Sequence, residues 1–327
     1  MEEKFIIAGG IPRKYGELMS YGHVLREAEI ATIDYDKKEY TSKLKYIPDT
    51  DFCPEDRPSV GFTSFSIHKE KIYIATSTQV LIISLSSFEI LEKINDPLFN
   101  DIHHVKIINN NLYVVVTGLD ALFEYDLKTK NRTIFNTLGK DPFHRFDKDK
   151  NLNKVVSTKP HESHPNHVFA IGDEVWVTRF QQKDAVCITD MSKRMDIGVG
   201  FPHDGFVKDG VAYFTTVNGY VVGFDTKTFK KVIDIKLTGK DSKSDTPLGW
   251  CRGLYVEDDF FFVGFTQLRT TKVTENLAWL KTMIKEKKIL EKPAPTRIEK
   301  YTIDGRYVSQ FELPSTGVFT IFSIEKI

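Results

Sequence analysis

Short apolar strands and polar turns alternate along this chain in a repeating order. A unit consists of an apolar run, a short polar turn, a second run rich in aromatic and β-branched residues, a third run that ends on an acidic turn, and a fourth run. In one unit, the second, third and fourth runs are residues 112–117, 123–126 and 132–135. Four strands per unit at a spacing of roughly 40 residues is typical of a β-propeller blade.

Five such units lie within the chain, and a sixth is divided between its two ends. Residues 318–324 have the pattern of an inner strand, and residues 4–8, 29–35 and 40–44 supply the other strands of that blade. Pairing the two ends in one blade closes the ring and removes open strand edges. We therefore predict an all-β fold, a six-bladed β-propeller closed by pairing of the N- and C-terminal strands in one blade.

The pattern places the whole chain, residues 1–327, in a single propeller domain. The expected blades are residues 1–48 together with 316–327, and then 59–95, 100–139, 165–200, 201–240 and 250–315.

The long connections all fall on one face of the expected disc. They are residues 9–26, 140–166, 239–250 and 266–296, and each leads into an inner strand or joins a second strand to a third. Elaboration of one face is typical of a scaffold with a functional mouth.

The connection at 266–296 predicts a short helical insertion on this top face, because Leu277, Leu280 and Ile284 recur at helical spacing. Two interpretations stay open. The helix packs on the disc for stability, or it forms a lid over the channel with Trp279 facing a ligand.

Three histidines occupy the same position in successive units. His104, His167 and His203 each stand eight residues before the first apolar residue of the second strand. Ser64 and Arg252 hold this position in two further units. Because a position that repeats in sequence repeats in space, these side chains should surround a common axis.

Converging imidazoles suggest three alternatives. His104, His167 and His203 could bind a catalytic zinc, iron or manganese ion, since three nitrogens with an open fourth position describe such a site. Without a metal, the same histidines could act as general acid and base, with Arg252 orienting a carboxylate or phosphate. The third alternative is a structural polar plug in the channel.

The neighbours of these residues add to the candidate site. His103, His164, Asn166 and Asp204 flank the histidines and, with Trp279, are expected to bind substrate.

The tetrapeptide His164-Pro165-Asn166-His167 resembles the histidine-proline openings of inner strands in virginiamycin B lyase-like propellers. The blade pattern is also similar to that of the wider superfamily of gluconolactonases and NHL-repeat propellers. The resemblance implies a site at the mouth of the channel and often a divalent metal. Calcium-binding lactonases use Glu, Asn and Asp ligands, whereas this ring is dominated by histidine, which favours a softer metal or none.

Composition restricts the partners and the compartment. Lys+Arg and Asp+Glu both number 45, so no global attraction to nucleic acid or to an anionic membrane is expected. No apolar run approaches the roughly 20 residues of a membrane span. The three cysteines, Cys53, Cys187 and Cys251, are scattered along the chain, which favours a reducing compartment and hence the cytoplasm.

We therefore expect an enzyme, a lyase, hydrolase or isomerase, that acts on a small polar or anionic molecule. His104, His167, His203 and Arg252 would form its centre, with or without a divalent transition metal. The alternative is a noncatalytic propeller that presents its elaborated face to a protein or a glycan. The substrate, the reaction and the oligomeric state stay open.

Overall fold

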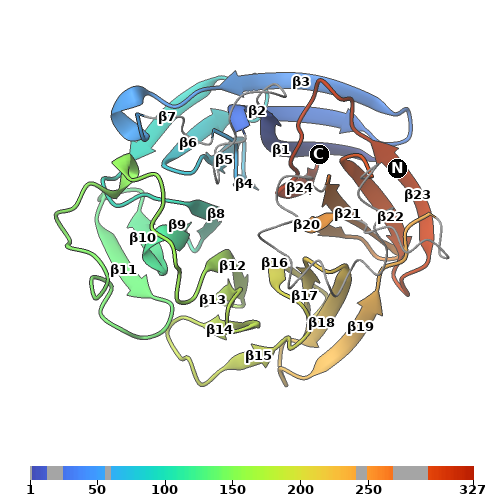
Figure 1. The fold of residues 1–327 in the computed structure, drawn as a ribbon. Helices are drawn as coiled ribbons and strands as arrows, with labels where there is room; N and C mark the ends of the chain where they lie inside the picture. Colours follow the sequence, from blue (N-terminus) through green and yellow to red (C-terminus); the bar gives the residue numbers. More distant parts are fainter. Residues whose placement is uncertain (1, 13–24, 56–59, 241–248, 268–293) are drawn as a thin grey trace, which may run out of the picture.

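The structure is a computed structural model that describes residues 2–12, 25–55, 60–240, 249–267 and 294–327. These residues form six four-stranded antiparallel sheets arranged around an axis as the blades of a β-propeller (Figure 1). The all-β, six-bladed fold predicted from the repeat pattern is thus confirmed. The expected helix within 266–296, with Trp279, lies outside the described residues.

Three blades come first in chain order, and their strands are given from the axis outwards. The first is β24 (Ser323–Lys326), β1 (Lys4–Pro12), β2 (Leu25–Asp34) and β3 (Glu39–Tyr46). The second is β4 (Ser64–His68), β5 (Lys71–Ala75), β6 (Gln79–Ser84) and β7 (Ile90–Asn95). The third is β8 (Ile102–Ile108), β9 (Asn111–Val116), β10 (Ala121–Asp126) and β11 (Arg132–Asn136).

The other three blades have the same order. The fourth is β12 (Pro165–Ile171), β13 (Glu174–Arg179), β14 (Asp184–Cys187) and β15 (Arg194–Asp196). The fifth is β16 (Pro202–Lys208), β17 (Val211–Thr216), β18 (Tyr220–Asp225) and β19 (Lys231–Lys236). The sixth is β20 (Trp250–Val256), β21 (Phe260–Thr266), β22 (Arg297–Thr302) and β23 (Tyr307–Glu312).

Helical structure in the described residues is limited to three single turns of 3₁₀ helix: η1 (Thr50–Phe52), η2 (Thr117–Leu119) and η3 (Leu152–Lys154). No helix among the described residues is long and apolar enough to cross a membrane.

Tight hairpin turns explain why the inner strand of a blade turns back at once. Asn109 and Asn110 join β8 to β9 with φ of 50° and 67°, and Asp209 and Gly210 join β16 to β17 with φ of 49° and 77°. Two-residue turns with positive φ at both positions match the right-handed twist of the flanking strands, and Asn, Asp and Gly adopt this conformation most readily.

The two ends of the chain close the ring as predicted, because Phe5 to Ala8 pair with Lys326 to Ser323. The inner strand is shorter than the predicted 318–324 and begins only at Ser323. Just before it, the chain crosses β1 closely, since a Cβ on Gly9 would lie 1.7 Å from the backbone oxygen of Thr320. Gly9 therefore permits a contact that a larger residue would block.

The strands flanking the first long connection also run further than predicted. β1 continues to Pro12 and β2 begins at Leu25, where Ile11 and Leu25 are buried, so only residues 13–24 separate the two strands.

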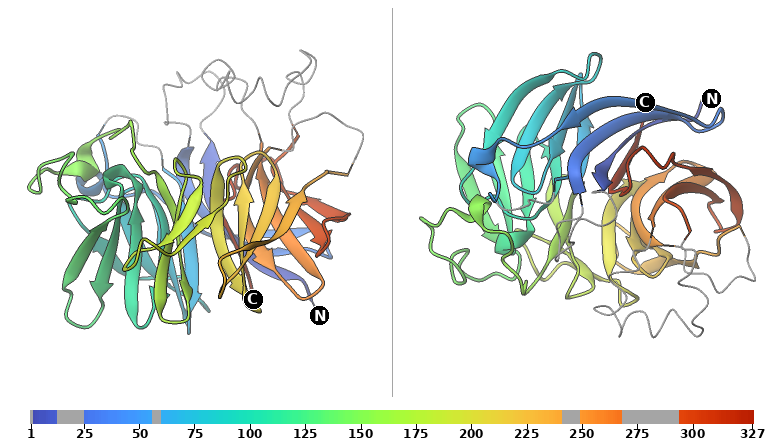
Figure 2. Two further views of the ribbon diagram at one scale, coloured as in Figure 1. Left: turned by 90° about the horizontal axis from the view of Figure 1, so that it is seen from below. Right: turned by 45° about the horizontal axis from the view of Figure 1, so that its top comes forward.

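The apolar core consists of six clusters, each lying between two neighbouring blades. Between the first and the last blade, Phe5 packs against Phe262 with ring centroids 4.7 Å apart, and Tyr35 packs against the same ring at 5.3 Å. Burying one such aromatic side chain contributes roughly 1.5–3 kcal/mol. Both termini emerge on one face of the disc, and the loop that precedes β12 lies on the other (Figure 2).

Deleting residues 316–327 should abolish cooperative unfolding, because it removes β24 and exposes the edge of β1 and the cluster around Phe5. Urea unfolding followed by fluorescence and circular dichroism would measure this. Ile327→Ala is the control, since that side chain is 52% exposed and should change little. A truncated protein that unfolds like the parent would contradict the closure of the ring.

Candidate functional site

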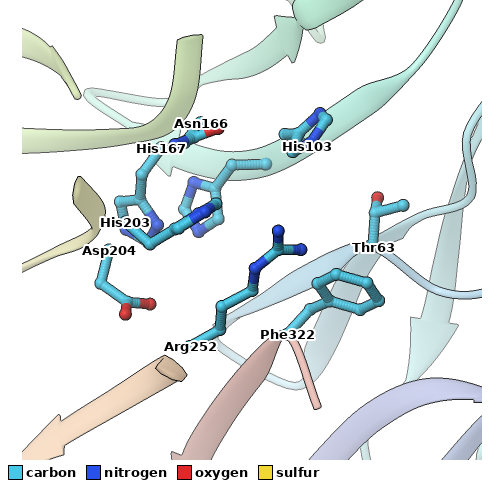
Figure 3. Close-up of a pocket in the computed structure, with 9 residues that line it drawn as sticks. Thr63, His103, Asn166, His167, His203, Asp204, Arg252 and Phe322 are labelled. Atoms are coloured by element: carbon cyan, nitrogen blue, oxygen red, sulfur yellow. The ribbon is translucent and has the colours of Figure 1, made fainter. Parts of the chain in front are cut away.

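A narrow pocket opens at the end of the axis where the inner strands begin (Figure 3). All six blades contribute to its wall, which consists of Thr63, His103, His104, Asn166, His167, His203, Asp204, Arg252 and Phe322. The volume open to water-sized molecules is about 20 Å³. That is room for roughly one or two waters, or for one polar group of a larger ligand.

Side chains at the axis accept hydrogen bonds from the backbone of the next inner strand. Four bonds of this kind join Ser64 Oγ to Val105 N (3.1 Å), His104 Nδ1 to Val168 N (3.2 Å), Asp204 Oδ1 to Gly253 N (3.2 Å) and Ser323 Oγ to Phe65 N (3.4 Å). In each bond, the backbone N–H belongs to an inner strand and is not used in the antiparallel pairing of the blade that contains it. They link neighbouring blades where the inner strands converge.

His104 is therefore a structural link as well as a pocket residue. Because its Nδ1 accepts the N–H of Val168, the proton of the neutral ring lies on Nε2. The ring stacks on that of His167, with centroids 3.5 Å apart and 25° between the planes. Burial, His167 and Lys106 hold the pKa of His104 well below its usual range, and burial and Lys106 hold the pKa of His167 down in the same way.

His203 differs from the other two histidines. Its Nε2 is buried, and no residue in the described part of the chain forms a hydrogen bond with it. Burial, followed by the charge of Arg252, keeps its pKa well below the usual range, so the ring is neutral at pH 7.

Asn166 presents a second buried polar atom of this kind. Its Nδ2 donates to the carbonyl of Pro202 at 2.7 Å, and its Oδ1 has no partner among the described residues. A buried polar atom without a partner costs roughly 1–3 kcal/mol, a cost that a ligand or water in the pocket would remove. Asn166 and His203 therefore mark the point in the pocket where a ligand or an ordered water belongs.

The pocket also contains a fixed cation and a carboxyl group. Figure 3 shows the side chain of Arg252 projecting into the middle of the lining residues. Its guanidinium carbon lies 5.1 Å from the ring centroid of Phe322 and 5.9 Å from that of Trp250, which stabilises the charge by cation–π contact. Burial raises the pKa of Asp204 to about 6, although bonds from Thr215 and Gly253 and the charge of Arg252 oppose the shift.

The loop before β12 brings another histidine to the edge of the pocket. The buried carboxylate of Asp120 accepts three consecutive backbone N–H groups, from Glu162 (2.9 Å), Ser163 (2.9 Å) and His164 (2.8 Å). The loop is thereby fixed, and the ring of His164 lies 4.9 Å from that of the pocket residue His103.

Arg145 anchors the same loop from its other side. Its guanidinium contacts the carboxylate of Asp120 and donates to the carbonyls of Thr158 (2.7 Å) and Pro160 (2.6 Å).

The structure brings most of the predicted site residues together. His104, His167, His203 and Arg252 line one pocket, as do His103, Asn166 and Asp204 of the predicted substrate-binding set. His164 lies beside the pocket, and Trp279 lies outside the described residues. Ser64 shares the phase of the histidines but serves the blade interface, and its neighbour Thr63 lines the pocket instead.

Sequence reasoning missed some residues that shape this region. Thr63 and Phe322 line the pocket and directly precede the inner strands β4 and β24. Their position at the start of an inner strand was the feature of the sequence that could have identified them. Thr158 and His161 lie in the same loop as His164, and the spacing of three between the two histidines could have drawn attention to His161.

The predicted metal ligands do not form an arranged set. Within the described ranges, no group of three or more His, Cys, Asp or Glu side chains is placed to hold a metal ion. His104 and His167 present ring faces to each other, and Nδ1 of His104 is engaged by Val168. A metal requirement stays a prediction without a ligand set to support it.

No protein-family model matches this sequence, and no match is found among curated proteins. The site must therefore indicate the function, because a propeller fold by itself supports many activities.

Stability should fall steeply as the pH drops below about 6.5, the ordinary pKa of histidine. The folded state lowers the pKa of six histidines, which are His103, His104, His161, His164, His167 and His203. At a pH between their folded pKa values and 6.5, the unfolded chain therefore binds more protons than the folded one. Each can remove about 1.4 kcal/mol of unfolding free energy per pH unit in that window.

Asp204 acts in the opposite direction. Its raised pKa makes the folded state bind the extra proton between 3.8 and about 6, which offsets part of the loss on acidification. Urea unfolding at pH 7.5, 6.0 and 5.0 would measure the balance. An unfolding free energy that stays constant over this range would contradict the neutral histidine cluster.

His104→Ala should destabilise the protein by about 1–3 kcal/mol more than His203→Ala, because only the first leaves the buried N–H of Val168 without an acceptor. The pair is matched, since each variant deletes one buried imidazole from the same pocket. Equal losses of unfolding free energy would show that the bond to Val168 contributes nothing.

Proposed function

We propose that this protein is an enzyme that binds a small anionic molecule at the mouth of the channel and moves a proton to or from it. The observation that carries the proposal is the buried Nε2 of His203, which has no hydrogen-bond partner in the part of the chain that the structure describes and shares a pocket with the guanidinium of Arg252. The reaction would be that of a lyase, a hydrolase or an isomerase, since each of these needs a placed acid or base.

An anionic group suits this pocket for two reasons. Arg252 supplies a charge that is permanent at physiological pH and a planar donor set that fits a carboxylate or phosphate. The surrounding imidazoles are neutral and do not repel an anion. The carboxylate of Asp204 in the same lining is engaged by the hydroxyl of Thr215 and the N–H of Gly253. The pocket volume of about 20 Å³ accommodates the charged group only. The rest of the substrate would extend out of the pocket.

Proton transfer suits the same residues. A neutral imidazole has one nitrogen that can accept a proton and one that can donate, and the lowered pKa of His203 keeps its ring neutral to a pH below the usual range. Burial raises the pKa of Asp204 to about 6, but its carboxylate accepts the hydroxyl of Thr215 and the N–H of Gly253, so His203 is the group assigned to proton transfer. Groups with pKa values displaced by burial next to a fixed charge are frequent in active sites.

Two finer expectations belong to this proposal. The similarity of residues 164–167 to virginiamycin B lyase-like propellers favours a lyase among the three reaction classes. The three cysteines are free and buried, which agrees with a cytoplasmic location.

The test is a screen of small carboxylic and phosphorylated acids incubated with the protein in D₂O and followed by ¹H NMR. Loss of a C–H signal or formation of a product identifies substrates. For these, His203→Gln should lower the rate by roughly 10²- to 10⁴-fold, the usual contribution of a general acid or base. His68→Gln, at the hairpin turn where β4 ends and so at the opposite end of that strand from the pocket residue Thr63, should leave the rate unchanged.

Arg252→Lys should weaken binding of the same acids, because an ammonium group cannot reproduce the two parallel hydrogen bonds of a guanidinium. Isothermal titration would measure the affinity. Unchanged affinity in Arg252→Lys, or unchanged turnover in His203→Gln, would overturn the proposal. Binding without any turnover would favour the noncatalytic alternative.

A further inference from the structure

A chain of hydrogen bonds runs from the third blade to the edge of the pocket, and its direction can be deduced from its first member. The Nδ2 group of Asn100 donates to the carbonyls of Leu152 (2.9 Å) and Val155 (2.7 Å). Because both partners only accept, the orientation of the amide is fixed and its Oδ1 must face the other way as an acceptor. Asn100 therefore sets the donor-to-acceptor direction of the whole chain.

Thr158 is the second member. Its hydroxyl donates to Oδ1 of Asn100 at 3.1 Å, and the same oxygen lies 3.2 Å from Nε2 of His161. A hydroxyl has one proton, and Asn100 receives it. His161 must therefore donate from Nε2 to the oxygen of Thr158.

The two histidines of the loop complete the chain. With its proton on Nε2, neutral His161 has a lone pair on Nδ1, which lies 3.0 Å from Nδ1 of His164. His164 must therefore carry its proton on Nδ1 and donate it to His161. The Nε2 of His164 is left with a lone pair that can accept a proton.

We propose that Asn100, Thr158 and His161 are positioning residues that fix the tautomer of His164, and that Nε2 of His164 is a second proton-accepting group beside the pocket, where the ring lies 4.9 Å from that of His103. On protonation, a new N–H bond forms at Nε2 with a proton from the bound molecule. The electrons of the bond that the proton leaves stay on that molecule. The Nδ1–H of His164 stays on His161 as a hydrogen bond. The role of His164 in catalysis rests on the proposed function, whereas the assignment of its tautomer does not.

The surroundings support this chain. A Cβ on Gly118 would lie 2.5 Å from Oδ1 of Asn100, so glycine is needed for the close contact that seats the amide. The bonds of Asp120 to three loop amides fix the backbone at His164. His103, which donates from Nδ1 to the carbonyl of Asp101 at 2.9 Å, has the same tautomer.

Electrostatics keep the chain neutral at pH 7. Burial lowers the pKa of His161 to about 4, although Asp101 and Asp120 oppose the shift and His103 and Lys159 add to it. Burial also lowers the pKa of His164, and the groups that face it add to that shift: His103, His161, Lys159 and Arg252. Charging His161 would force both of its nitrogens to donate and would reverse the tautomer of His164.

The test is ¹⁵N NMR of the intact protein labelled at histidine, with His164→Gln used to assign the signal. At pH 7, Nδ1 of His164 should show the chemical shift of a protonated nitrogen and Nε2 that of an unprotonated one. On acidification, Nε2 should be the atom whose shift moves. His104 should show the opposite tautomer and serves as an internal reference. A proton on Nε2 of His164 at pH 7 would overturn the inference.

Substitutions at Thr158 separate the chain from the loop that contains it. Thr158→Val removes the hydroxyl and should let both tautomers of His164 be populated, so that its two ¹⁵N shifts approach each other, while Thr158→Ser should restore the wild-type values. Thr137→Val is the matched control, because its hydroxyl also bonds this loop, at Ser163 Oγ (2.9 Å), but lies outside the chain. A wild-type tautomer in Thr158→Val would show that the chain does not set it.

These measurements use no ligand, so their outcome does not depend on the proposed function. If the tautomer is as inferred but no acid is bound or turned over, the proposed function fails and the chain stands. If acids are turned over and His164 has its proton on Nε2, the second proton acceptor fails and the role of His203 stands.

Discussion

The inner strands of this propeller converge on an axis, where the backbone N–H groups that the blades leave unpaired need acceptors. Four of these donors are satisfied across a blade boundary by Ser64, His104, Asp204 and Ser323. The bonds hold neighbouring blades together at the point of closest approach, and the apolar clusters between the blades complete the ring. Together with the pairing of β24 and β1, they place six strand openings around a single pocket.

The same constraint divides the polar residues of the channel into two groups. Those that accept a backbone N–H, such as His104, are committed to the fold. Those that are left over, above all Nε2 of His203 and Oδ1 of Asn166, are buried without a partner among the described residues. Chemistry is assigned to the second group because a buried polar atom without a partner costs stability, and a ligand or water in the pocket would offset that cost.

Much of the fold could be predicted from the sequence because a four-strand repeat of similar length has few solutions, and the residues at each strand opening had to meet at the axis. The different contacts of His104 and His203 could not be predicted in this way. The irregularity in pairing precedes His104 in β8, between Ile102 and His104, but comes after His203 in β16, between His203 and Phe206. A bulge re-aims the side chains next to it, so equal spacing in sequence does not give equal contacts.

The hydrogen-bond chain to His164 was also beyond sequence reasoning. It depends on which way the amide of Asn100 faces, and two carbonyls more than 50 residues further along the chain decide that orientation.

A crystal structure of the protein at neutral pH tests the central claim most directly. The account predicts ordered density from water or an anion within hydrogen-bond distance of both Nε2 of His203 and Oδ1 of Asn166, with Nδ1 of His104 on the N–H of Val168. A His203 ring that pairs with a protein acceptor, or a His104 ring released from Val168, would contradict the division between structural and functional histidines.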